Sequence, residues 1–233
     1  MKLIVTGATG YVASEVLRLA VKMSEITSVV AVARRPVKLT GPGADKIRSV
    51  VIEDMANIPM PSGQNSRGHP HASENAADMD DDRTVAVLPQ RTFSMDADEV
   101  RRVCETAVAG LSAMSDARPA KPFRFLHMSG TLGAREKVDK PLLMGTYGLM
   151  WGDVEKKVLA LAAELGVEAC VAKPGFISNG SGVGNALGWV IKKSGAAPAL
   201  TVTELSRAML RQVVGGFEKE PLTGEDLERL GRQ

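Results

Sequence analysis

The 233 residues of this chain can bury a substantial hydrophobic core, and 44% hydrophobic with 24% charged residues is an ordinary balance for a globular protein. A net charge of +2 and an aromatic content of 4% argue against nucleic-acid binding and against an anionic membrane surface as a partner. The N-terminus carries no run typical of a secretory signal, and no apolar run reaches the length of a membrane span. We therefore expect a cytoplasmic protein that binds neither nucleic acid nor membrane.

Short apolar runs alternate with helical patterns along the first part of the chain. Strands are predicted at 2–6, 28–33 and 49–52, and a helix is predicted from about Gly10 with its apolar residues at spacings of three and four. Each strand is short, rich in β-branched residues and unbroken. This composition is typical of a parallel sheet covered by helices on both faces.

Residues 59–83 interrupt this alternation with a segment rich in Pro, Gly, Ser, Asn and Asp. Such a composition predicts a polar loop excursion and not a second domain. A functional lid and an inert insertion are both open interpretations. The alternation then resumes, with predicted strands at 84–88, 123–128 and 167–172 and predicted helices at 96–114, 149–165 and 203–214. We expect one α/β domain over 1–233, a doubly wound parallel sheet.

The loop between the first strand and the first helix reads TGATGYVA at positions 6–13. A helix N-terminus presents unpaired N–H groups and the positive end of the helix dipole, and together these bind a diphosphate. In this loop Gly7 permits a tight turn, Gly10 permits close approach of the phosphate, and the small Ala13 lets the helix pack on the strand. The strand–loop–helix context indicates a dinucleotide-binding Rossmann domain. The residues predicted to contact the cofactor here are Gly7, Thr9, Gly10, Tyr11 and Val12.

Arg34 and Arg35 follow the second predicted strand, where such domains meet the adenosine ribose. A guanidinium suits a 2′-phosphate, so this pair favours NADP(H), although two solvated surface arginines are the simpler alternative. Asp54 and Met55, after the third strand, are predicted to approach the adenine. Pro89 ends the fourth strand at the edge of the sheet where ligands collect.

Five segments in this order resemble the atypical branch of the short-chain dehydrogenase/reductase superfamily, close to the proteins related to nucleoside-diphosphate-sugar epimerases. They are TGATGYVA at 6–13, ARR at 33–35, HMSG at 127–130, YGLMWGDVEKKV at 147–158 and AKPGFI at 172–177. The resemblance implies that Ser129 polarises a substrate carbonyl and that Tyr147 exchanges a proton with the substrate oxygen. It implies that Pro174 and Gly175 lie near the nicotinamide, that the substrate is a small molecule, and that the chain forms a homodimer.

One residue departs from the family pattern. The family places a lysine four residues after the tyrosine, where it lowers the tyrosine pKa, and this chain has Trp151 there. An indole carries no charge, so cofactor binding looks complete while the proton-transfer machinery does not. Three hypotheses follow: an NADP(H)-dependent reductase of a small carbonyl compound, which we favour; a non-redox isomerase or cyclase; and a non-catalytic NADP(H)-binding sensor or interaction protein.

The remaining candidate groups are a histidine and two cysteines. His127 lies two residues before Ser129, so the two side chains should share a strand face. His127 is a proton donor if that face looks into the cleft, and otherwise a packed and hydrogen-bonded residue. Cys104 and Cys170 are expected to be buried, reduced thiols, and the spacing of Cys and His predicts no metal site.

Overall fold

The computed structural model describes residues 1–51, 84–88, 123–131, 135, 145–178 and 199–233. Its main element is a six-stranded sheet with the strand order β3-β2-β1-β4-β5-β6, in which every neighbouring pair is parallel. The strands are β1 (Lys2–Thr6), β2 (Ser28–Ala33), β3 (Ile47–Val51), β4 (Thr84–Leu88), β5 (Arg124–Met128) and β6 (Glu168–Ala172). The order reverses between β1 and β4, and ligands bind at such a reversal in open α/β sheets.

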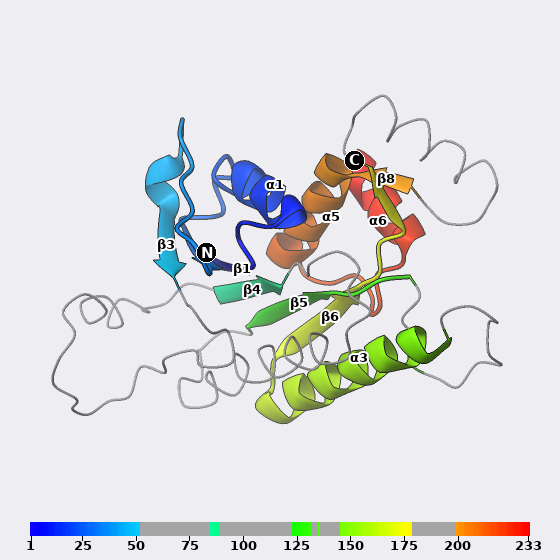
Figure 1. Ribbon diagram of the computed structural model, residues 1–233. Helices are drawn as coiled ribbons and strands as arrows, with labels where there is room; N and C mark the ends of the chain where they lie inside the picture. Colours follow the sequence, from blue (N-terminus) through cyan, green and yellow to red (C-terminus); the bar gives the residue numbers. More distant parts are fainter. Residues whose placement is uncertain (52–83, 89–122, 132–134, 136–144, 179–198) are drawn as a thin grey trace, which may run out of the picture.

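Helices cover both faces of this sheet, as predicted. Figure 1 shows α1 and α5 on one face and α3 on the other. The helical elements are α1 (Tyr11–Ala20), α3 (Gly145–Leu165), α5 (Val202–Gly215), α6 (Gly224–Arg232) and the short 3₁₀ helix η1 (Ala44–Lys46). A separate two-stranded parallel sheet consists of β7 (Phe176–Ser178) and β8 (Ala199–Thr201). The doubly wound α/β class is therefore confirmed. Among the described helices, none combines the length and apolarity needed to cross a bilayer.

Most predicted elements are confirmed, with differences at their ends. The strands at 2–6, 28–33 and 84–88 have the predicted bounds. β3 begins at Ile47, two residues earlier than predicted, and α3 begins at Gly145 rather than at residue 149. Gly145 and Gly148 weaken the helix pattern at this end, and the tertiary context overrides the low helix propensity of the buried Gly148. The predicted helix at 96–114 and the loop at 59–83 lie outside the described residues.

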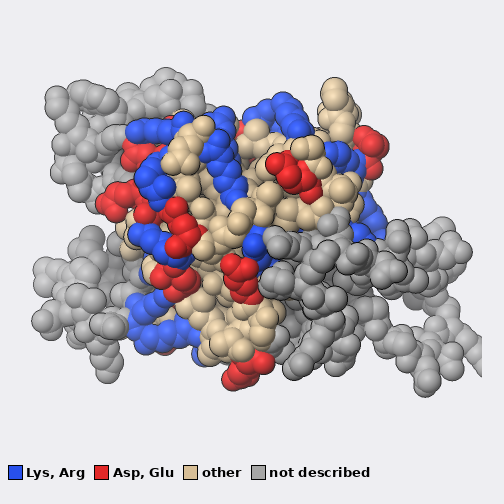
Figure 2. Space-filling view, turned by 180° about the vertical axis from the view of Figure 1, so that it is seen from behind, with Lys and Arg blue, Asp and Glu red and all other residues tan. Residues whose placement is uncertain are grey.

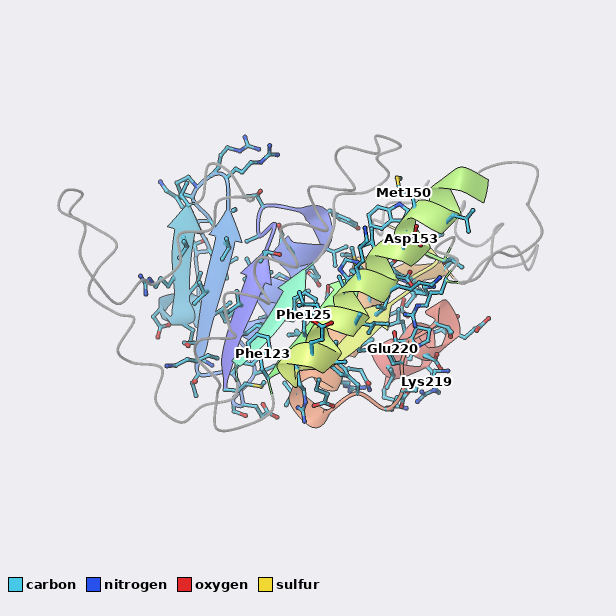
Figure 3. All side chains as sticks on the ribbon, turned by 90° about the horizontal axis from the view of Figure 1, so that it is seen from below. Phe123, Phe125, Met150, Asp153, Lys219 and Glu220 are labelled. Atoms are coloured by element: carbon cyan, nitrogen blue, oxygen red, sulfur yellow. The ribbon has the colours of Figure 1, made fainter. Side chains whose placement is uncertain are left out.

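Side chains of β5 divide the core into two clusters, because successive residues of a strand point to opposite faces. Leu126 and Met128 pack in the cluster that includes buried residues of α1 and α5. Phe123 and Phe125 pack instead against the buried side of α3, and Figure 3 shows them beneath this helix. The two faces of β5 are therefore fixed in register, and Ser129 continues the face directed toward α3.

The C-terminal part of the chain is tied to the main sheet at β6. Leu222 forms a parallel bridge with Ala172, donating its N–H to the Val171 carbonyl at 2.9 Å, and its carbonyl accepts the N–H of Lys173 at 2.8 Å. These bonds bring the segment between α5 and α6 to the carboxyl end of β6. Glu220 lies alongside α3 as a result (Figure 3).

α5 and α6 pack closely because a glycine stands at their contact. An added Cβ at Gly231 would lie 2.4 Å from the backbone oxygen of Glu204. Overpacking of this kind costs about 1–3 kcal/mol, so we expect Gly231→Ala to lower the Tm by several degrees. The matched control is Gly215→Ala, at an exposed position in α5 where a Cβ meets nothing within 4 Å. Thermal unfolding measures both, and an equal Tm for the two variants would contradict this packing.

Candidate functional site

The loop after β1 has the geometry of a phosphate-binding turn. Gly7 has a φ of 61°, in the left-handed region that favours glycine, and its carbonyl accepts the N–H of Gly10 at 2.7 Å. A Cβ at Gly10 would lie 3.0 Å from that same oxygen. Gly10 is the N-cap of α1, and no described side chain caps this end of the helix. The first N–H groups of α1 therefore lack both intrahelical and side-chain acceptors.

The loop lies at the edge of the sheet where the strand order reverses. The N–H of Ala8 donates to the Val32 carbonyl at 3.0 Å, which holds the loop against the end of β2. Arg34 and Arg35 follow directly after β2, and both are exposed. The predicted diphosphate and adenosine positions are thus on one edge. The side chain of Val12 is buried in the core, so only its backbone faces the loop.

Tyr11 connects the phosphate loop with the small sheet. Its hydroxyl donates to the Ser178 carbonyl at 3.0 Å, while 48% of the residue remains exposed. Partial burial, and to a smaller extent the negative charge of Glu15, raise the pKa of Tyr11. Tyr11 is therefore a protonated hydrogen-bond donor at neutral pH, and it joins the start of α1 to the end of β7.

Ser129 contacts a buried carboxylate on α3. The backbone N–H of Ser129 donates to the Ala172 carbonyl at 2.8 Å, which places the residue at the carboxyl end of β5 beside β6. Its Oγ donates to Glu155 Oε1 at 2.7 Å. The side chain of Glu155 has 0% exposure. A carboxylate so far from water requires partners of opposite charge.

Two cations supply those partners. Glu155 Oε2 accepts a hydrogen bond from Arg135 Nε at 2.7 Å and lies 3.0 Å from Lys173 Nζ. Arg135 also donates two hydrogen bonds through its guanidinium to Glu220, in the segment before α6. The hydrogen bonds that Arg135 donates to Glu220, and then the one that it donates to Glu155, raise the pKa of Arg135 against the opposing effect of burial. We call Ser129, Arg135, Glu155, Lys173 and Glu220 the Glu155 cluster.

Comparison with known proteins identifies this architecture. No family model matches the sequence, and no curated protein sequence matches it. A short chain dehydrogenase from Burkholderia cenocepacia, solved with NADP, superposes with a TM-score of 0.56 at 16% identity, covering 99% of this chain and 91% of that chain. The UDP-glucuronic acid 4-epimerase from Bacillus cereus, solved with NAD, has a TM-score of 0.60 at 15% identity, covering 95% and 76%. Vestitone reductase from alfalfa has a TM-score of 0.59 at 15% identity, covering 94% and 74%.

The chain shares the Rossmann-type fold of these solved proteins. These solved structures confirm the fold that the resemblance of the sequence motifs implied. Identities of 10–16% among such neighbours establish the fold and not the chemistry. The roles of individual residues must therefore be argued from the geometry of this chain.

Several predicted site residues lie in the part of the fold that the structure describes, and others do not. Pro174 and Gly175 follow β6, and the Pro174 carbonyl accepts a hydrogen bond from Thr131 Oγ1 at 2.8 Å, which joins the loops after β5 and β6. Tyr147 lies in the first turns of α3, but its side chain is outside the described part. The residues that lie wholly outside it are Asp54, Met55, Pro89 and Cys104.

Trp151 lies in the hydrophobic interface between α3 and the sheet. It is 7% exposed and packs in one cluster with Phe123 and Phe125. The indole is thus part of the hydrophobic core. Trp151 stands where the family pattern has its lysine, and among the described residues Arg135 and Lys173 are the cations that contact Glu155, the partner of Ser129.

His127 is a neutral core residue. It has 0% exposure, and neither ring nitrogen has a hydrogen-bond partner among the described residues. Burial, and to a lesser extent the charge of Arg135, lower its pKa to about 4. The packed alternative is confirmed, without the hydrogen bond that we expected, and His127 cannot donate a proton at neutral pH.

Sequence reasoning missed four members of the Glu155 cluster. Glu155 lies eight residues after Tyr147 and four after Trp151. Helical spacing could therefore have predicted that these three residues lie on the same side of α3. Lys173 stands in the quoted AKPGFI segment. Arg135 and Glu220 had no local signal. Cys170, in contrast, is buried as expected, and burial raises the pKa of its thiol to about 12.

A lysine at position 151 would be inserted into an apolar interface. We expect Trp151→Lys to reduce the free energy of unfolding by about 3–5 kcal/mol, because the aromatic packing is lost and a charge is buried. The matched control is Leu149→Lys, an exposed position of the same helix, for which we expect a change within about 0.5 kcal/mol. Denaturant unfolding measures both. A Trp151→Lys protein as stable as the control would show that the indole is not structurally required.

His127 predicts a pH dependence of stability. Its pKa is 6.5 in the unfolded chain and about 4 in the folded protein, so only the unfolded state takes up the proton between these values. The free energy of unfolding should therefore be highest above pH 6.5 and should fall as the pH drops toward 4. At pH 5 the loss is about 2 kcal/mol. Denaturant titrations at pH 7 and pH 5 should show this loss in the wild type but not in His127→Phe, and the same slope in both would exclude His127 as its source.

Proposed function

We propose that the chain binds NADP(H) along the carboxyl edge of its parallel sheet. The diphosphate lies at the N-terminus of α1, and the adenosine 2′-phosphate lies at Arg34 and Arg35. The observation that carries this proposal is the turn at Gly7, which leads into a helix without a side-chain cap at the reversal of strand order. The backbone N–H groups of Thr9, Tyr11 and Val12 are the donors that we assign to the diphosphate.

The residues of this loop fit such a group sterically. A Cβ at position 10 would crowd the Gly7 carbonyl at 3.0 Å, so only glycine keeps the turn and leaves room in front of the helix. The side chain of Val12 is buried and does not obstruct this space. The exposed hydroxyl-bearing residue Thr9 adds a polar side chain at the same turn.

The choice of NADP(H) over NAD(H) rests on the two arginines. The Burkholderia dehydrogenase is solved with NADP and the Bacillus epimerase with NAD, so the fold is compatible with either dinucleotide. Over the described part of the face in Figure 2, basic and acidic side chains are intermixed, so overall charge does not select the ligand. Two exposed guanidinium groups directly after β2 are the specific feature that suits a 2′-phosphate.

We further infer an NADP(H)-dependent reductase of a small carbonyl compound. NADPH supplies a hydride when it is bound. Tyr147 is the group that we assign to deliver a proton to the substrate oxygen, from the first turns of α3. Trp151 provides hydrophobic packing and no charge, so Tyr147 acts without the neighbouring ammonium of the family pattern. Pro174 and Gly175 border the nicotinamide position after β6.

The reaction is tested with deuterium-labelled NADPH and a panel of small aldehydes and ketones. We expect deuterium in the alcohol product, detected by mass spectrometry, with one dinucleotide oxidised per product. NADPH binding without transfer to any compound would favour the sensor hypothesis. Product formed without net oxidation of NADPH would favour the isomerase or cyclase hypothesis.

Arg34 and Arg35 should discriminate between the two dinucleotides. We expect Arg34→Ala/Arg35→Ala to weaken NADP⁺ binding by about 10- to 100-fold and to leave NAD⁺ binding unchanged, because only NADP⁺ carries the 2′-phosphate. Isothermal calorimetry measures both affinities. Arg232→Ala, which also removes a surface guanidinium but in α6, is the control for net charge. Equal losses for NADP⁺ and NAD⁺ would place the arginines elsewhere on the ligand.

A further inference from the structure

The hydroxyl of Ser129 has a single proton, and the Glu155 cluster determines where that proton points. A serine hydroxyl donates one hydrogen bond and accepts up to two. An ionised carboxylate only accepts. Since Ser129 Oγ lies 2.7 Å from Glu155 Oε1, Ser129 must be the donor in this pair. Toward any other group, the Ser129 hydroxyl can only accept a hydrogen bond through its lone pairs.

The carboxylate itself is held in one orientation. Glu155 Oε2 receives Arg135 Nε at 2.7 Å and Lys173 Nζ at 3.0 Å, so the two cations select this oxygen and turn Oε1 toward Ser129. Glu220 fixes the other side of the Arg135 guanidinium. Glu155 is fully buried, so water does not replace Ser129 as a donor to the carboxylate. These contacts join α3, the loop after β5, the end of β6 and the C-terminal segment.

We propose that Ser129 recognises substrate as a hydrogen-bond acceptor, so that the group facing it is a hydroxyl or an N–H and not a carbonyl oxygen. Glu155 is the positioning residue that imposes this polarity. The inference rests on the proposed function, because it concerns the substrate side of the same dinucleotide site. It replaces the carbonyl-polarising role that the family resemblance assigned to Ser129.

The substrate class follows from this polarity. The ligand that satisfies Ser129 carries a donor, as an alcohol does, and the ketone of the same carbon skeleton does not. The alcohol of a carbonyl/alcohol pair is therefore the form that this serine stabilises.

One substitution reverses the predicted polarity. In Glu155→Gln, the amide oxygen is drawn to Arg135 and Lys173, because these two are donors only. The amide NH₂ then points at Ser129 and donates to it. The serine proton becomes available, and Ser129 can donate to a carbonyl. The matched control is Glu164→Gln, the same change at an exposed position of α3.

The probes are cyclohexanol and cyclohexanone, which share a skeleton and differ in the presence of a donor. Ligand-observed NMR gives the Kd of cyclohexanol in the NADPH complex and the Kd of cyclohexanone in the NADP⁺ complex. Neither combination can react, because an alcohol needs NADP⁺ and a ketone needs NADPH. Each variant is compared with the wild type for the same combination of probe and dinucleotide. The measurements are repeated without dinucleotide, and calorimetry of NADP(H) separately reports whether the proposed function holds.

We expect Ser129→Ala to weaken cyclohexanol about fivefold, the effect of one hydrogen bond, and to leave cyclohexanone unchanged. Glu155→Gln should strengthen cyclohexanone by a similar factor, and the gain should vanish in Glu155→Gln/Ser129→Ala. Equal weakening of both probes by Ser129→Ala would overturn the proposal, as would a folded Glu155→Gln protein with no gain. If Glu155→Gln fails to fold, the Ser129→Ala comparison decides alone.

Discussion

A parallel sheet brings the loops that follow all of its strands to one edge, and this constraint organises the molecule. The reversal of strand order between β1 and β4 separates the helices onto two faces and leaves the start of α1 exposed at that edge. The phosphate-type turn, the two arginines after β2, Ser129 after β5 and Lys173 after β6 all lie there for this single topological reason. Every functional proposal for this chain depends on their shared location.

The Glu155 cluster places a fully buried carboxylate next to this edge of the sheet. A buried carboxylate is tolerated only because two cations and a hydroxyl satisfy it, and removing one partner from such a group is strongly destabilising. The cluster draws on four separate segments, so it couples the candidate site to the C-terminal segment that pairs with β6. The stability of the fold and the proposed role of Ser129 therefore depend on the same contacts.

The replacement of the family lysine by Trp151 has a packing consequence as well as an electrostatic one. The indole extends the aromatic cluster formed with Phe123 and Phe125, which holds α3 against the sheet. The cations near Ser129 come from Arg135 and Lys173 and are neutralised by Glu155 and Glu220. The chain thus has the Rossmann-type fold of the solved neighbours, and Ser129 has a buried ion-pair cluster beside it.

The sequence by itself determined the class of fold, the parallel sheet and the position of the glycine-rich turn that leads into α1. These depend on local signals: β-branched runs, helical periodicity and the glycines of TGATGYVA, each readable over a few residues. It also predicted that Cys170 is buried and that α3 ends at Leu165, just before Gly166, whose φ of 66° suits a glycine after a helix end.

The tertiary structure alone decided which groups meet at the site. Ser129, Arg135, Glu155 and Glu220 are separated by up to 91 positions in the sequence, and no local pattern indicates that they form one cluster. The burial of His127 without a described partner and the packing of Trp151 likewise depend on which face of β5 meets α3. Such contacts arise from long-range packing, in which the partner of a residue is set by the assembled layers and not by its neighbours in the chain.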